Sequence, residues 1–176
     1  MIRRRTVAVL LATAVPVVAW SAADFVYDDP QTGYYSIHPM SFAPDGGEPA
    51  GGYFTSWNRG RLIPDSSTQQ CMNAGVNLPD DAVVQEVQVW FSANSTSVPL
   101  YATLVRTELD SGRGTRLVED DFTDGSGNRV SRTRSVDDAV ARINNAQYQY
   151  GFGVCVRGQT IFNGARIKYT YRKAGD

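Results

Sequence analysis

The sequence has 176 residues, 42% of them hydrophobic, and its 17 basic residues nearly balance its 18 acidic ones, for a net charge of −1. The length is that of a single domain. Without a basic excess, the balance argues against a protein that binds nucleic acid or an anionic membrane, because positive charge supplies most of the affinity in both cases.

The N-terminus has the order of features found in an export signal. Three arginines within Met1–Arg5 precede an apolar run from Thr6 to Ala19, and the small residues Ser21-Ala22-Ala23 follow. The run is short for a membrane-spanning helix, so we expect cleavage after Ala23 and a secreted or cell-surface protein; an uncleaved anchor is the alternative. Loss of residues 1–23 would make the net charge about −4.

Residues 24–57 form an aromatic segment that is interrupted by prolines and glycines. Short strands are expected at 25–27, 34–38 and 52–57, separated by a loop. The aromatic residues of interest are Tyr34, Tyr35, Tyr53, Phe54 and Trp57. Such residues either complete the core or, when exposed, stack on sugars and fill protein interfaces.

The clearest strand of the middle region spans Ala82–Ala93. Its apolar face is predicted to consist of Val83, Val87, Val89 and Phe91, interrupted by Gln85. Trp90 falls on the opposite, polar face with Glu86 and Gln88, so alternation places it outside the main core, under a loop or in a contact with another subunit.

Further strands are expected at 100–109, 116–123 and 129–135, joined by turns rich in glycine and aspartate. Residues 136–144 are the one candidate helix, with Ser135 as its cap and Asp137 and Asp138 in the first turn.

The C-terminal stretch 147–172 is predicted to form the last two strands, a terminal hairpin joined by a short loop. In the first, Tyr148, Tyr150, Phe152, Val154 and Val156 share an apolar face, while Cys155 lies on the other. In the second, Ala165, Ile167, Tyr169 and Tyr171 alternate with Arg166, Lys168, Thr170 and Arg172, so a basic face is left outside. Asn163-Gly164 predicts a type I′ turn that joins a short strand at 159–162 to the last one.

Many short strands with one minor helix indicate an all-β protein: a single antiparallel β-sandwich or jelly roll. The domain is expected to cover 58–176, or 24–176 if the aromatic segment belongs to it. The order of Cys71, LPDDAVVQEVQVWF (78–91), YQYGFGVC (148–155) and FNGARIKYTY (162–171) resembles a group of secreted bacterial β-sandwich proteins, over roughly residues 71–171. The resemblance implies a fold and brings no catalytic residue.

Cys71 and Cys155 are the two cysteines, and an even number in an exported chain predicts one disulfide. Closing so long a loop would stabilise the fold by roughly 4.5 kcal/mol in the chain-entropy model. Two buried free thiols are the alternative.

Candidate catalytic and metal sites are few. His38 is the single histidine and lacks a Gly-x-Ser-x-Gly elbow, so a solvated loop residue is favoured over a catalytic one, and a standard zinc site is excluded. Asp121, Asp124 and Asn128 are a weak candidate for calcium, against the simpler interpretation of a solvated turn. No cofactor is expected.

These features favour a secreted, non-enzymatic β-sandwich that acts in binding or as a structural subunit. A carbohydrate-binding module is the alternative function, and a hydrolase is the least favoured. The expected partners are a carbohydrate or another copy of the chain, with residues 24–57 crossing to a neighbour by strand addition. Neither nucleic acid nor, once the signal is cleaved, a membrane is expected as a partner.

Overall fold

The computed structural model describes residues 25–44, 53–56, 61–64, 69–93, 100–122, 127–137, 139–157 and 160–174. These residues form eleven strands and one 3-10 turn. In chain order they are β1 (Phe25–Ile37), η1 (Pro39–Ser41), β2 (Ala43–Pro44), β3 (Tyr53–Ser56), β4 (Arg61–Pro64), β5 (Gln70–Val76), β6 (Val83–Ala93), β7 (Leu100–Glu108), β8 (Gly114–Phe122), β9 (Gly127–Ser135), β10 (Tyr148–Val156) and β11 (Ile161–Ala174). This described part contains no helix long and apolar enough to cross a membrane.

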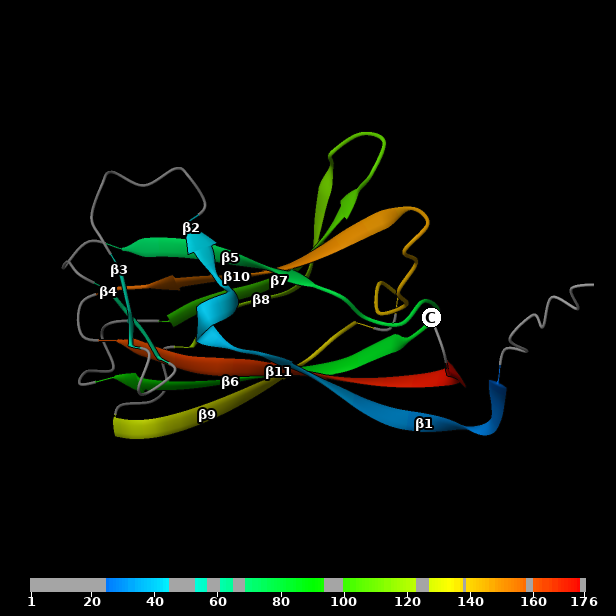
Figure 1. The fold of residues 1–176 in the computed structure, drawn as a ribbon, viewed down its shortest axis with the longest axis horizontal. Coiled ribbons are helices and arrows are strands. Elements are labelled where there is room, and N and C mark those ends of the chain that lie inside the picture. The colour runs from blue at the N-terminus through cyan, green and yellow to red at the C-terminus, as the bar shows by residue number, and fades with distance from the viewer. Residues whose placement is uncertain are drawn as a thin grey trace, which may run out of the picture.

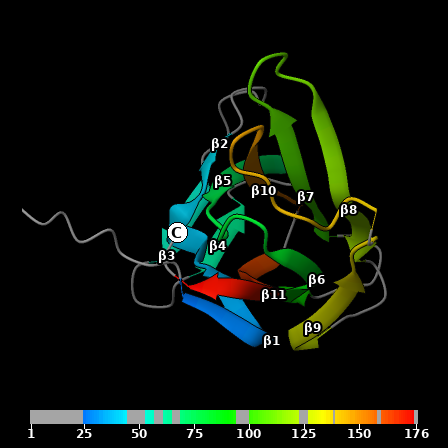
Figure 2. The same cartoon turned by 90° about the vertical axis from the view of Figure 1, so that its right-hand side faces the viewer.

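The strands make two antiparallel sheets that lie face to face (Figures 1 and 2). Sheet A has the order β3-β4-β11-β6-β9, with β1 as a sixth strand that also pairs with β11. Sheet B has the order β2-β5-β10-β7-β8. The predicted all-β sandwich is therefore confirmed.

The core lies between the sheets and is built mainly by alternate residues of the strands on both sides. In β10, Tyr150, Phe152, Val154 and Val156 are buried, as their shared face predicts. Phe91 of β6 is also fully buried, together with other apolar side chains of sheet A that include Val87, Val89, Phe162 and Ile167. Burial of these two apolar faces is the main drive for the two layers to associate.

The predicted arrangement of the C-terminal stretch is wrong in one respect, because β10 and β11 lie in different sheets. Asn163 and Gly164 form no hairpin turn; β11 runs through them from Ile161 to Ala174. Gly164 has a φ of +140°, and the pairing with β6 shifts between Phe162 and Gly164, which marks a β-bulge. A bulge needs the same backbone freedom as a turn, so the same residues serve either.

A second bulge changes the predicted face of β6. Val84 is fully buried and Val83 only half-buried, because the register with β11 shifts by one residue next to Gln85. Beyond the bulge, Val87, Val89 and Phe91 face the core as expected.

The predicted helix at 136–144 is absent from the described residues of that segment. Its backbone bonds to the strand beside it: Val84 N–H donates to Ala141 at 2.9 Å, and Ile143 N–H donates to Ala82 at 2.7 Å. Ala141 and Ile143 are fully buried. Extended pairing with β6 buries these two side chains, which outweighs a short helix with few internal bonds.

The aromatic N-terminal segment begins as one long strand rather than two short ones. Nine residue pairs join β1 to β11 of the same chain, from Phe25 opposite Ala174 to Ile37 opposite Ala165. Ile37 is buried in the core. Of the two expected arrangements, the structure has β1 within its own sheet.

The predicted disulfide joins Cys71 of β5 to Cys155 of β10 and is confirmed. The two residues stand directly opposite each other in sheet B, with their Cα atoms 4.0 Å apart. The bond therefore connects neighbouring strands of one sheet, although 84 positions separate the cysteines in the sequence.

Candidate functional site

The solvent-facing side of sheet A can be assembled row by row from the strand register. We call it the outer face of sheet A. Residues that stand opposite each other in antiparallel strands point to the same side, and successive rows lie two residues apart along each strand. The rows are Gly164–Trp90–Ser131, then Ser36–Arg166–Gln88–Thr133, then Tyr34–Lys168–Glu86–Ser135, then Thr32–Thr170–Val83–Arg142.

Tyr34 and Trp90, both candidates from the sequence, meet on this face around Arg166. The Arg166 Cζ atom lies 4.7 Å from the centroid of the Tyr34 ring and 5.3 Å from that of the Trp90 ring. The Tyr34 side chain is 54% exposed, which is unusual for a large aromatic residue in this fold, while Trp90 is half-buried. A guanidinium over an aromatic face contributes about 0.5–1 kcal/mol at an exposed site, so Arg166 holds both rings in place.

A line of hydrogen bonds continues from this cluster across three strands. Arg166 donates from Nη2 to the Gln88 Oε1 atom at 2.9 Å, and Gln88 donates from Nε2 to the Ser131 hydroxyl at 2.7 Å. In the next row, Lys168 and Glu86 form an ion pair at 3.8 Å. The face thus combines aromatic rings with guanidinium, amide and hydroxyl groups that are oriented by hydrogen bonds to one another.

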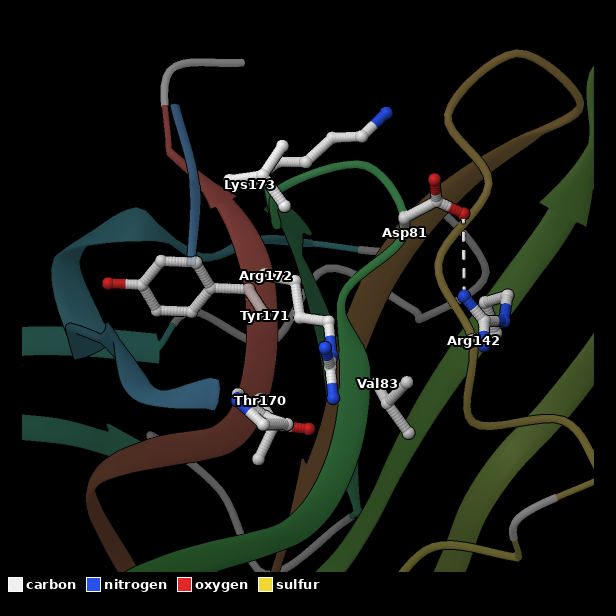
Figure 3. Close-up of a pocket in the computed structure, with 9 residues that line it drawn as sticks. Asp81, Val83, Arg142, Thr170, Tyr171, Arg172 and Lys173 are labelled. Carbon is white, nitrogen blue, oxygen red and sulfur yellow. Dashed lines mark ion pairs between the residues drawn. The ribbon is translucent and has the colours of Figure 1, made fainter. Parts of the chain in front are cut away.

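The same face ends in a cavity of about 310 Å³ beyond the row of Thr170 and Val83 (Figure 3). Arg142 and Asp81 form an ion pair on one side of it at 3.5 Å. Arg172 of β11 lies across it, and its Nη1 donates to the backbone carbonyl of Asp28 at 2.9 Å. The cavity therefore lies at the end of the same polar stripe of β11 that carries Arg166.

The outer face of sheet B has a different character. A groove of about 400 Å³ crosses it, with Gly151 and Gly153 in its floor and Asn73, Thr107 and Gln149 around it. Tyr150 also borders the groove, but its ring is buried and its hydroxyl accepts the Asn144 N–H at 2.8 Å. This groove offers polar groups without an exposed ring among its lining residues.

Next to the groove, a charged network covers the edge of sheet B. The Tyr101 hydroxyl donates to Glu119 Oε1 at 2.6 Å, and Arg116 donates to Glu119 Oε2 at 2.7 Å. The hydrogen bond from Tyr101, supported by Arg116, lowers the pKa of Glu119. Burial and the bond to this carboxylate raise the pKa of Tyr101. The Glu119 carboxylate therefore accepts hydrogen bonds from both of the other side chains.

Two further candidates from the sequence, Tyr35 and His38, are described and lie outside the cluster of Tyr34 and Trp90. Tyr35 is half-buried and packs against the core. Tyr53 and Phe54 belong to β3, and Trp57 and Asp124 lie outside the described residues. His38 is exposed at the start of η1, and its Nδ1 accepts the Met40 N–H at 3.1 Å.

Two of the three weak calcium candidates belong to strands of the structure, and the third, Asp124, lies outside the described residues. Asp121 is exposed on β8, and Asn128 belongs to β9 of the other sheet. In the described ranges, no three His, Cys, Asp or Glu side chains lie close enough together to hold a metal ion.

Sequence reasoning recognised Trp90 on a polar face and a basic stripe on β11, but it did not connect them. Arg166 was identified as part of that stripe without its two aromatic partners, and Arg142 was assigned to a helix. The connection depends on the register of β1, β11 and β6, which no local pattern contains.

No protein-family model matches the sequence, and a search of curated proteins finds no match. Solved structures with a similar course of the backbone include the C-terminal CBM6 of LamC, a laminarinase of Zobellia galactanivorans, at 17% identity and a TM-score of 0.47, over 77% of this chain and 98% of that one. The xylan-binding module CBM15 matches at 10% identity and a TM-score of 0.49, over 78% and 97% of the two chains. A CBM6 module of Cellvibrio mixtus lichenase 5A, solved with cellotriose, matches at 13% identity and a TM-score of 0.41, over 76% and 95%. These neighbours are β-sandwich carbohydrate-binding modules, and the function of this chain has to be argued from its own side chains.

Proposed function

We propose that the protein is an exported carbohydrate-binding module that holds an oligosaccharide on the outer face of sheet A. The observation that carries this proposal is the exposed Tyr34 ring and the Trp90 ring on either side of Arg166, on one solvent-facing surface. It takes up the alternative function named from the sequence, a carbohydrate-binding module, in place of the main expectation of a structural or assembly subunit.

The chemistry of the face fits a sugar because a pyranose ring has two kinds of surface. Its C–H groups form an apolar face that packs on an aromatic ring, and its hydroxyls project from the edge and need donors and acceptors. Tyr34 and Trp90 offer the rings. Arg166, Gln88 and Ser131 offer a donor-rich and acceptor-rich line beside them, already ordered by their mutual hydrogen bonds. Ordering before binding reduces the entropy that the ligand must overcome.

Export of the chain is part of the proposal. The basic, apolar and small residues of Met1–Ala23 have the order of a cleaved signal. The Cys71–Cys155 disulfide suits an oxidising compartment outside the cytoplasm. Polysaccharides of cell walls and extracellular matrices are encountered in that compartment.

The test is isothermal titration of the purified chain with a panel of oligosaccharides, preceded by affinity electrophoresis against the parent polysaccharides. We expect Trp90→Ala to weaken binding at least about tenfold, equivalent to about 1.4 kcal/mol. Tyr34→Ala should weaken it similarly, and Trp90→Phe should restore part of the affinity because it restores a ring.

Tyr101→Ala is the matched control, since Tyr101 is a half-buried aromatic residue on the other sheet. It should leave the dissociation constant unchanged. A chain that binds glycan equally well after Trp90→Ala, but not after Tyr101→Ala, would move the site to sheet B. A chain that binds no glycan in the panel would contradict the proposed function.

A further inference from the structure

The charged residues that line the cavity at the end of the outer face of sheet A are mainly cations. Arg142, Arg172 and Lys173 line it, and the one carboxylate among its lining residues is that of Asp81 (Figure 3). This local excess of positive charge stands out because the chain as a whole carries a net charge of −1.

The two arginines keep donors available for a ligand. Arg142 is tied only loosely, because its contact with Asp81 is 3.5 Å long and its side chain is 68% exposed. Exposed pairs of this kind contribute little to stability, so a ligand can replace Asp81 as the partner at small cost. Arg172 uses one N–H on the Asp28 carbonyl, and a guanidinium has five.

The cavity and the aromatic cluster belong to one continuous surface. Arg166, Lys168, Thr170 and Arg172 alternate along the outward side of β11, and Val83 and Arg142 continue the row of Thr170. At about 3.3 Å per residue, the stretch from Arg166 to Arg172 spans roughly 20 Å. One extended oligosaccharide of several sugar units can therefore contact both ends.

We infer that the ligand of this face is an anionic oligosaccharide, with a carboxylate or sulfate group bound between Arg142 and Arg172 while a neighbouring sugar packs on Tyr34 and Trp90. This inference rests on the proposed function and adds the chemical class of the glycan. A guanidinium matches both anions geometrically, since two parallel N–H groups meet two oxygens. Lys168 lies between the two ends and is paired with Glu86 at 3.8 Å, so this pair adds no excess of positive charge outside the cavity.

The experiment compares oligosaccharides that differ only in charge. The first pair is tetragalacturonate and its fully methyl-esterified form, which differ in the charge of the carboxylate. The second pair is a sulfated galactan tetrasaccharide and its desulfated form, which differ in sulfate. Titration calorimetry should show at least about tenfold tighter binding of one acidic form over its neutral counterpart. The acidic form that binds more tightly identifies the anion. Its affinity should fall with rising salt, whereas that of the neutral form should not.

Two variants, Arg172→Gln and Arg142→Gln, test whether the preference for the acidic form arises in the cavity. Each should reduce the preference for the acidic form about fivefold or more and leave the neutral form unaffected. Arg116→Gln is the matched control, because Arg116 is 62% exposed, makes a single ion pair and lies on sheet B. It should alter neither affinity.

The possible outcomes separate the two ideas. Acidic and neutral forms that bind equally well, with loss of both on Trp90→Ala, would overturn the inference and leave the proposed function standing. Absence of binding to all four probes would overturn the inference, and absence of binding to every glycan of the wider panel would overturn the proposed function as well. The salt dependence of the unaltered chain gives the same answer without any variant.

Discussion

Two tyrosines show how single side chains are fixed in this fold. Tyr150 is 6% exposed, and its hydroxyl accepts the Asn144 N–H at 2.8 Å, so a buried polar atom secures the 144–147 turn. Tyr169 covers Gly33 of the neighbouring strand and stands beside Tyr171 with ring centroids 5.8 Å apart. Burial raises the pKa of both Tyr150 and Tyr169, because the phenolate is disfavoured there.

The raised tyrosine pKa values predict a loss of stability at alkaline pH. An unfolded tyrosine ionises near pH 10, and below that pH both states are protonated and the folded state keeps its full stability. As pH rises from there towards the higher folded pKa, the unfolded state releases protons first and stability falls. Urea unfolding should give a lower free energy at alkaline pH than at neutral pH. In Tyr150→Phe the alkaline loss should be smaller, and an unchanged pH dependence would contradict the assignment.

At Gly33, we expect the addition of a single methyl group to destabilise the fold. A Cβ atom there would come within 2.5 Å of the Tyr169 ring, so the ring would have to move away from Tyr171 and from β1. We expect Gly33→Ala to lower the free energy of unfolding by about 1–2 kcal/mol. Gly75→Ala is the control, because no described atom outside Gly75 and its two chain neighbours lies within 4 Å of its Cβ position. Equal stability of the two variants in urea would contradict the close approach.

At the scale of elements, alternation and register carry different information. Alternation correctly predicted the buried face of β10, the outward stripe of β11 and the outward position of Trp90. It could not assign β10 and β11 to different sheets, because a period of two identifies a face and not a neighbour. It also missed the bulges at Gly164 and Gln85, each of which shifts the pattern by one residue.

For the candidate site, too, the sequence predicted the face of a single strand but not its neighbours. The polar-face position of Trp90 follows from its own strand, but its contact with Arg166 requires β11 beside β6, and the contact of Arg166 with Tyr34 requires β1 beside β11. Those pairings join segments far apart in the sequence. They are decided by the whole packing and not by any local preference.

We expect the disulfide between β5 and β10 to make a measurable contribution to the free energy of unfolding. The double variant Cys71→Ser, Cys155→Ser should lose about 2–4 kcal/mol, mainly because the unfolded chain is no longer constrained. The fold should persist, since Met72, Val154 and Val156 remain to bury sheet B. Urea midpoints of the oxidised and reduced protein and of the variant check this. A midpoint that does not change on reduction would show that the bond adds nothing.

At the scale of the whole molecule, β1 determines whether β11 has a paired or an open edge within one chain. It covers one edge of β11, and its Ile37 is buried in the core. Without it, the paired backbone groups of β11 from Ala165 to Ala174 would form an open edge on that side.

Deletion of residues 25–37 should therefore produce a chain that aggregates or loses its near-ultraviolet circular dichroism. The control is a chain that begins at Asp24, which should remain folded and elute as a monomer in size-exclusion chromatography with light scattering. A folded, monomeric deletion variant together with an oligomeric control would instead support a β1 that crosses to another subunit.

The position of β11 at the centre of sheet A has a consequence for the order of folding during synthesis. Its partners β1, β4 and β6 all precede it in the chain, so a ribosome has made every one of them before it makes the strand that joins them (Figure 1). The pairs β3–β4 and β6–β9 do not need it, but sheet A can be completed only after synthesis has reached Ile161–Ala174. Pairing between segments so distant in the sequence is typical of slow folding, because the entropy of closing long loops is lost before the contacts are gained.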